Sequence, residues 1–171
     1  MSERFEGLGA GDRPLTPEQC AERARAAAAL VDLAALDSSG AGGATLLWRT
    51  EHSEAWLNTW WQPRDTGYHD HGGSCVGVHV LAGRATNEPL VIGGGRRVTT
   101  HEAGSSFSFP GSGIHRMDHD PGAVTVHVYS PPIPEIGHYD VVGGELRRTA
   151  GPPDEPSAPS AGLLASLGAD G

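Results

Sequence analysis

The strongest chemical signal in the chain is the tripeptide His69-Asp70-His71. On a β-strand, residues two apart project to the same face and lie roughly 6–7 Å apart along the chain. Both imidazoles could therefore reach one metal ion, and imidazole suits zinc, copper, nickel and iron alike. Because the chain has nine histidines, the pair could also be a chance arrangement on the surface.

Residues further along the chain favour the metal site. Gly83 follows at the distance that closes the first cupin motif, and Val76 stands where that motif has a glutamate ligand. The spacings of the second cupin motif are met by Gly104, Pro110 and His115, with Ser112 in place of its inner glycine. The chain thus resembles a cupin that has lost its carboxylate ligand and keeps three histidines, His69, His71 and His115.

Loss of the carboxylate has a chemical consequence. Three neutral imidazoles leave the full dipositive charge on the metal, so an anionic thiolate can bind and be partly neutralised. A facial set of three ligands also leaves three positions open, which is enough for a bidentate substrate and O2. The spacing does not identify the metal.

Residues 124–129 alternate strictly between valines and polar side chains. This pattern predicts a strand with its three valines on one face and Thr125, His127 and Tyr129 on the other. Period alone favours an ordinary amphipathic strand whose polar face is solvated. The alternative is a polar face turned towards the metal site.

The segments HDHGGS, GIHR and VHVYSPP, in this order and spacing between Trp48 and Asp140, resemble cysteine dioxygenase. The resemblance implies Fe(II) held by the three histidines and a relay of Thr125, His127 and Tyr129 beside it, with threonine in place of the family's serine. It implies oxidation of L-cysteine with O2 to cysteine sulfinate. Other small thiols, such as 3-mercaptopropionate or cysteamine, and a non-enzymatic metal- or ligand-binding cupin remain alternatives.

Two departures from the family concern cysteine and arginine. The cysteine that crosslinks to the tyrosine in mammalian members is replaced by Val76, and Cys75 should face the other way as a small buried hydrophobe, so no crosslink is expected. The family's substrate-binding arginine is best matched by Arg49, provided that residues 51–54 form a tight hairpin. Arg49 could otherwise be a solvated surface residue, and Arg64 and Arg116 are then the next candidates.

The elements that must position these residues are short strands. Thr16-Pro17-Glu18-Gln19 is a capping box, which predicts one N-terminal helix within residues 15–36. Beyond it, short apolar or alternating segments separated by turn residues predict a mainly β, jelly-roll cupin barrel over residues 15–148. These segments are 46–48, 55–61, 75–81, 90–92, 97–100, 106–109 and 123–129. Residues 1–14 should be a flexible lead-in, and 149–171 a disordered tail rich in Pro, Ala, Ser and Gly.

Length, net charge and cysteine content limit the classes of binding partner and the cellular compartment that we expect. The 171 residues fit one domain, and the net charge of −9 makes nucleic acid and anionic membranes poor partners. Two isolated cysteines and the lack of an apolar leader or spanning segment predict a cytoplasmic protein in a reducing compartment. The expected partners are a small thiol and O2, and the family resemblance implies a monomer.

Overall fold

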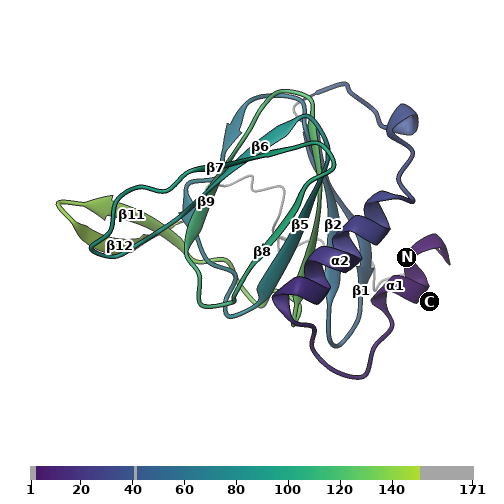
Figure 1. Ribbon diagram of the computed structural model, residues 1–171, viewed down its shortest axis with the longest axis horizontal. Helices are drawn as coiled ribbons and strands as arrows, with labels where there is room; N and C mark the ends of the chain where they lie inside the picture. Colours follow the sequence, from purple (N-terminus) through teal and green to yellow (C-terminus); the bar gives the residue numbers. More distant parts are fainter. Residues whose placement is uncertain (1–2, 41, 151–171) are drawn as a thin grey trace.

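The computed structural model describes residues 3–40 and 42–150. Two antiparallel sheets face each other, and one helix lies across the outer face of the first sheet (Figure 1). This mainly β, two-sheet architecture confirms the predicted fold class. Within the described residues, no helix has the length and apolar character needed to cross a membrane.

The first sheet has five strands, in the order β1 (Gly42–Arg49), β2 (Glu54–Trp60), β10 (Ala123–Ser130), β5 (Cys75–Ala82) and β8 (Ser106–Phe109). The second sheet runs β12 (Glu145–Thr149), β11 (His138–Val142), β4 (Tyr68–His69), β9 (His115–His119), β6 (Arg84–Pro89) and β7 (Thr99–Glu102), and β3 (Arg64–Asp65) also pairs with β9. The β11–β12 hairpin extends away from the body of the molecule (Figure 1).

Strand β10 is buried along its whole length. Its valines pack in a cluster with the helix on the outer face of the first sheet. On its other face, Thr125, His127 and Tyr129 are at most 4 % exposed. The prediction from the two-residue period, that this polar face is solvated, is therefore wrong, because the second sheet covers it.

Helix α2 (Pro17–Ala28) begins as predicted and ends early. The Thr16 side chain accepts from the backbone N–H of Gln19, and the Gln19 side chain accepts from that of Thr16. The prediction that the helix continues to about residue 36 is wrong. Its last buried residue is Ala28, and Leu30 beyond it is exposed, so the apolar face that docks the helix stops there. A short 3₁₀ helix, η2 (Leu33–Ala35), follows.

The N-terminal segment differs from the expected flexible lead-in. It contains the 3₁₀ helix η1 (Glu3–Phe5) and the short helix α1 (Glu6–Gly9), and Phe5 is buried in the core beside α2. An Arg23 guanidinium NH2 group donates to the carbonyl oxygens of Leu8 and Ala10, which holds α1 against α2. The predicted tail lies, from residue 151 onward, outside the described residues.

Two connections bear on the site. Residues 50–53 form the tight turn between β1 and β2, as the placement of Arg49 required. Residues 90–92, predicted as a strand, instead lie in the loop that joins β6 to β7. Their apolar side chains are partly or fully exposed, with Ile92 91 % exposed.

Close contact between α2 and β5 depends on Gly77. A Cβ atom at this position would lie 1.9 Å from the backbone nitrogen of Ala21. We therefore expect Gly77→Ala to push the helix from the sheet and to lower the free energy of unfolding by roughly 1–3 kcal/mol in urea denaturation. Gly43→Ala is the matched control, because a Cβ at this strand position meets no atom within 4 Å. Equal stability of the two variants would contradict the close helix–strand contact.

Candidate metal centre

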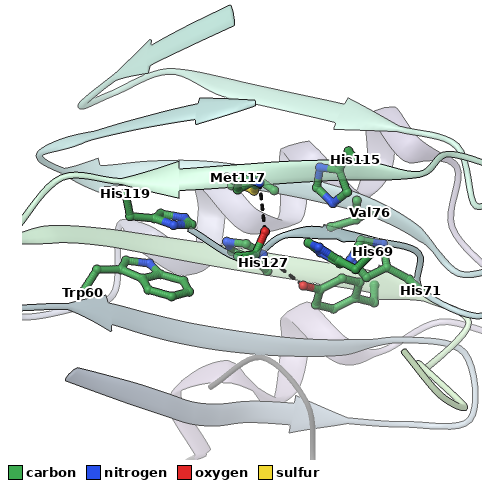
Figure 2. A pocket seen from close by; sticks show the side chains of 11 residues that line it. Trp60, His69, His71, Val76, His115, Met117, His119 and His127 are labelled. Atoms are coloured by element: carbon green, nitrogen blue, oxygen red, sulfur yellow. Dashed lines mark hydrogen bonds between the residues drawn. The ribbon is translucent and has the colours of Figure 1, made fainter. Parts of the chain in front are cut away.

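The three predicted ligands meet on the second sheet. His69 ends β4 and lies directly opposite His115, the first residue of β9. The ring centroids are 4.5 Å apart for His69 and His115, 5.0 Å for His69 and His71, and 5.3 Å for His71 and His115. One nitrogen from each ring lies within 4.8 Å of those of the other two, and all three residues are buried (Figure 2).

The two close histidines do not share a strand as expected. Strand β4 ends at His69, and His71 follows in the turn that leads to β5. Asp70 shapes this turn, because its backbone N–H donates to the Gly137 carbonyl and its carboxylate accepts from the Gly72 N–H. Convergence of the imidazoles therefore comes from a side-chain-stabilised turn rather than from strand periodicity alone.

Two hydrogen bonds orient the ligand rings. His69 Nδ1 donates to the Gly67 carbonyl at 3.1 Å, and His115 Nδ1 donates to Asn87 Oδ1 at 2.6 Å. Each bond leaves Nε2 with its lone pair, and such partners typically fix the tautomer and direction of metal ligands. His115 Nε2 is buried and has no hydrogen-bond partner within the described part of the chain. Asn87, which no sequence motif singled out, lies on neighbouring strand β6.

The three histidines are in the protonation state that binds a metal ion. Burial lowers the pKa of His69 to about 4 and holds the pKa values of His71 and His115 well below the usual range. All three are thus neutral near pH 7, the form that binds metal. A buried nitrogen without a partner beside two other neutral imidazoles fits a bound divalent cation. No carboxylate is found among the described residues that line this cavity.

The cavity extends from the three histidines between the two sheets (Figure 2). Its lining comprises Trp60, Thr66, His69, His71, Val76, Val78, His115, Met117, His119, His127 and Tyr129. Val76, at the position of the lost glutamate, is part of the wall and pairs in register with Tyr129. Cys75 faces the opposite side of the sheet, in the cluster that contains α2, as the sequence predicted.

The predicted relay is assembled on β10. His127 Nε2 lies 3.0 Å from Thr125 Oγ1, and His127 Nδ1 lies 3.0 Å from the Tyr129 hydroxyl oxygen. Burial lowers the pKa of His127 to about 3, so the imidazole remains neutral. The Tyr129 ring centroid is 4.9 Å from that of His71. His127 and Tyr129 on the first sheet therefore line the same cavity as the three metal-site histidines on its opposite side, and Thr125 contacts His127.

Trp60 and His119 complete the end of the cavity away from the three histidines (Figure 2). Trp60 Nε1 donates to Thr125 Oγ1 at 3.0 Å, which extends the relay to β2. The His119 ring stacks on the Trp60 indole, with centroids 3.8 Å apart. Sequence reasoning missed both residues. The alternation of His115, Met117 and His119 on one strand was a usable signal, since β9 buries these three positions.

Arg49 is placed differently from the other predicted site residues. It lies at the end of β1, is 31 % exposed in its side chain, and is not among the residues that line the cavity. Its Nε is 3.3 Å from Oε2 of Glu54, a fully buried glutamate whose Oε1 accepts from the Ile133 N–H. Glu54, on β2, is also the register partner of Tyr129, so Arg49 lies two strands from the relay. The alternative prediction was that Arg49 is a solvated surface residue. Its side chain is partly exposed, but it also forms an ion pair with Glu54.

The other two candidate arginines lie on the second sheet. Arg116 forms an ion pair with Asp65 and lies over the Tyr68 ring. Arg64 is the residue of β3 that pairs with His119. Neither lines the cavity.

The two sheets and the three-histidine site together define a metal-binding cupin, and comparison with known proteins identifies its family. The family model for cysteine dioxygenase type I matches residues 26–142. The chain therefore belongs to the cysteine dioxygenase type I family, a group of metal-dependent cupin dioxygenases. No curated protein matches the sequence significantly.

Solved structures with a similar fold are distant in sequence. KdgF from Halomonas sp. is 18 % identical, with a TM-score of 0.46, and the match covers 56 % of this chain and 85 % of that one. An RmlC-like cupin protein from Desulfovibrio desulfuricans is also 18 % identical, with a TM-score of 0.46, and the match covers 54 % of this chain and 84 % of that one.

The metal site leads to a direct test. We expect the purified protein to hold one metal ion per chain, and His69→Ala, His71→Ala or His115→Ala to lose most of it, because two imidazoles bind a divalent ion poorly. Elemental analysis measures the loss. His101→Ala is the control, since His101 stacks on Phe107 outside the cavity and should retain the metal. Full metal content in a ligand variant would remove that residue from the site.

Proposed function

We propose that the protein is an Fe(II)-dependent thiol dioxygenase that oxidises L-cysteine with O2 to cysteine sulfinate. The observation that carries this proposal is that His127 and Tyr129 line one cavity with the three-histidine site, while Thr125 contacts His127 Nε2. The family membership supports the same chemistry. When bound, Fe(II) would bring thiolate and O2 together and supply the redox chemistry.

The three histidines would hold the iron through Nε2 of His69 and His115 and one nitrogen of His71. Their neutral state leaves the metal charge available to attract a thiolate. Val76, where a cupin carboxylate would otherwise bind, leaves room and adds no negative charge. Val78 on the same strand and Met117 on the facing sheet add apolar side chains to the lining, which favours exclusion of water from the reacting groups.

The relay determines how the phenol is presented. Trp60 can only donate, so it occupies one lone pair of Thr125 Oγ1, and we propose that the threonine proton is donated to His127 Nε2. His127 then carries its own proton on Nδ1 and donates it to the Tyr129 oxygen. The Tyr129 hydroxyl proton is thereby directed away from His127, and we propose that it donates to the reacting groups in the cavity.

A dioxygenase for a thiol without a carboxylate is the second candidate. The specific observation that favours it is the Arg49–Glu54 pair, which lies outside the cavity lining and already gives the guanidinium a carboxylate partner. Oxygen uptake with cysteine, 3-mercaptopropionate and cysteamine separates the candidates. Preferred turnover of cysteine supports the main proposal, whereas no uptake with any thiol by iron-loaded protein would leave only a binding cupin.

Tyr129→Phe tests the relay. This change removes one hydroxyl and almost no volume, so iron content should persist while kcat falls about 10- to 1000-fold through loss of a positioned donor. The measurements are thiol-dependent O2 consumption and iron content. Tyr68→Phe is the control, because the Tyr68 hydroxyl donates to Glu88 and lies outside the cavity lining. Unchanged turnover in Tyr129→Phe would exclude the proposed donor role.

Arg49→Ala tests recognition of the substrate carboxylate. A charge-assisted pair of about 2–3 kcal/mol corresponds to a loss of roughly 30- to 150-fold in kcat/KM for cysteine. For cysteamine, which has no carboxylate, kcat/KM should differ little between wild type and the variant. A folding defect would instead lower kcat/KM for both substrates, so the comparison distinguishes loss of carboxylate binding from a folding defect. Arg116→Ala, which removes an ion pair with Asp65 and a contact with the Tyr68 ring outside the cavity, should show no such contrast. Equal losses for both substrates in Arg49→Ala would remove Arg49 from the binding site.

A further inference from the structure

The two cysteines of the chain meet although they are 55 residues apart. Their Sγ atoms lie 3.8 Å from each other, in contact but unbonded. Cys20 is completely buried and Cys75 is 8 % exposed. This pair takes no part in the metal site, since both side chains lie on the helix side of the first sheet.

The contact is set by two packed elements rather than by loose side chains. Cys20 lies in α2 and Cys75 begins β5, and the helix crosses this strand (Figure 1). Gly77, on the same face as Cys75, brings the strand against the helix backbone at Ala21, the neighbour of Cys20. A disulfide needs its sulfur atoms about 2.0 Å apart, so closure requires a shift of less than 2 Å along the line that joins them.

The two thiols differ in reactivity. The hydrogen bond from the Cys20 thiol lowers the pKa of Cys75, and the same contact, together with burial, raises the pKa of Cys20. When protonated, the Cys75 thiol instead donates to the Leu15 carbonyl oxygen at 3.4 Å. Because the thiolate is the nucleophile, Cys75, which is also the more exposed, is the one that reacts first.

We propose that Cys20 and Cys75 are a reversible dithiol–disulfide site that is oxidised by a hydroperoxide such as hydrogen peroxide. The Cys75 thiolate attacks one peroxide oxygen, the O–O bond breaks, and the leaving hydroxide takes up a proton to form water. The Cys20 thiol loses its proton and attacks the resulting Cys75 sulfenic acid, which forms the S–S bond and releases a second water. Two electrons pass from the sulfurs to the peroxide, and a small-molecule thiol reverses the reaction.

Such a bond would join α2 covalently to the strand behind the cavity wall. Cys75 precedes Val76, which lines the cavity, and pairs with Ser130, which follows Tyr129. The disulfide would thus form on the outer face of the strand pair whose inner face carries the proposed site. The inference does not rest on the proposed dioxygenase activity.

Thiol counting tests the proposal on the full-length, metal-containing protein. After treatment with hydrogen peroxide, denaturation and alkylation, wild type should take up no alkyl group, and its tryptic peptides that carry Cys20 and Cys75 should be joined. Dithiothreitol should restore two alkylatable thiols. Retention of both free thiols after peroxide treatment, or links only between separate chains, would overturn the proposal.

Two variants separate the steps. In Cys20→Ser, the Cys75 sulfenic acid has no partner, so dimedone should trap it, whereas wild type should give little adduct. An equally strong adduct in wild type would show that Cys20 does not resolve the sulfenic acid, against the proposal. The expected metal-free variant His115→Ala should form the same disulfide. A bond that forms in wild type but not in this variant would assign the oxidation to the metal centre and overturn the peroxide route.

Discussion

The structure depends on one strand that is buried on both faces. Strand β10 runs through the centre of the first sheet, with its valines against the helix and its polar residues between the sheets. A buried polar group without a partner costs about 1–3 kcal/mol, so these side chains must bond to one another. The chain from Trp60 through Thr125 and His127 to Tyr129 meets that requirement. The hydrogen bonds that satisfy the buried polar side chains of β10 also orient the Tyr129 phenol.

The proposed site has two halves, and neither sheet contains both. The second sheet supplies His69 and His115, with His71 in the turn that follows β4, and the first supplies the relay. Between them, apolar side chains of both sheets form a common cluster that includes Val78, Met117 and Tyr129. Packing of the two sheets therefore stabilises the fold and sets the distance from phenol to metal ligands, so the hydrophobic core and the site cannot be varied independently.

What could be predicted from the sequence was local in origin. The capping box at Thr16 specifies where α2 begins, and the alternation of residues 124–129 specifies which side chains share a face. The motif spacings then identified all three metal-site histidines. Whether the polar face of β10 was solvated could not be decided locally, because the answer depends on strands up to about 60 residues away that cover it.

Several features that sequence reasoning missed depend on long-range contacts. The helix ends where its docking surface ends, not where alanine propensity falls, and Asn87 matters because its strand lies beside that of His115. Glu54 is recognisable as a partner of Arg49 only once the β1–β2 register is known. The family resemblance implied the roles of Arg49 and Tyr129. The residues that contact each of them could be identified only from the structure.

The Arg49–Glu54 pair also affects the charge balance of the proposed site. The imidazoles are neutral and the arginine and glutamate charges cancel, so a bound Fe(II) would leave about two positive charges near the cavity. A thiolate neutralises one of them, and a carboxylate on the same substrate would neutralise the other. The Arg49–Glu54 contact engages Nε, and the two terminal NH2 groups provide the further donors that a guanidinium offers. In this arrangement Glu54 contacts one edge of the guanidinium, and a bound divalent ion, rather than the arginine, would supply the net positive charge that attracts an anionic substrate.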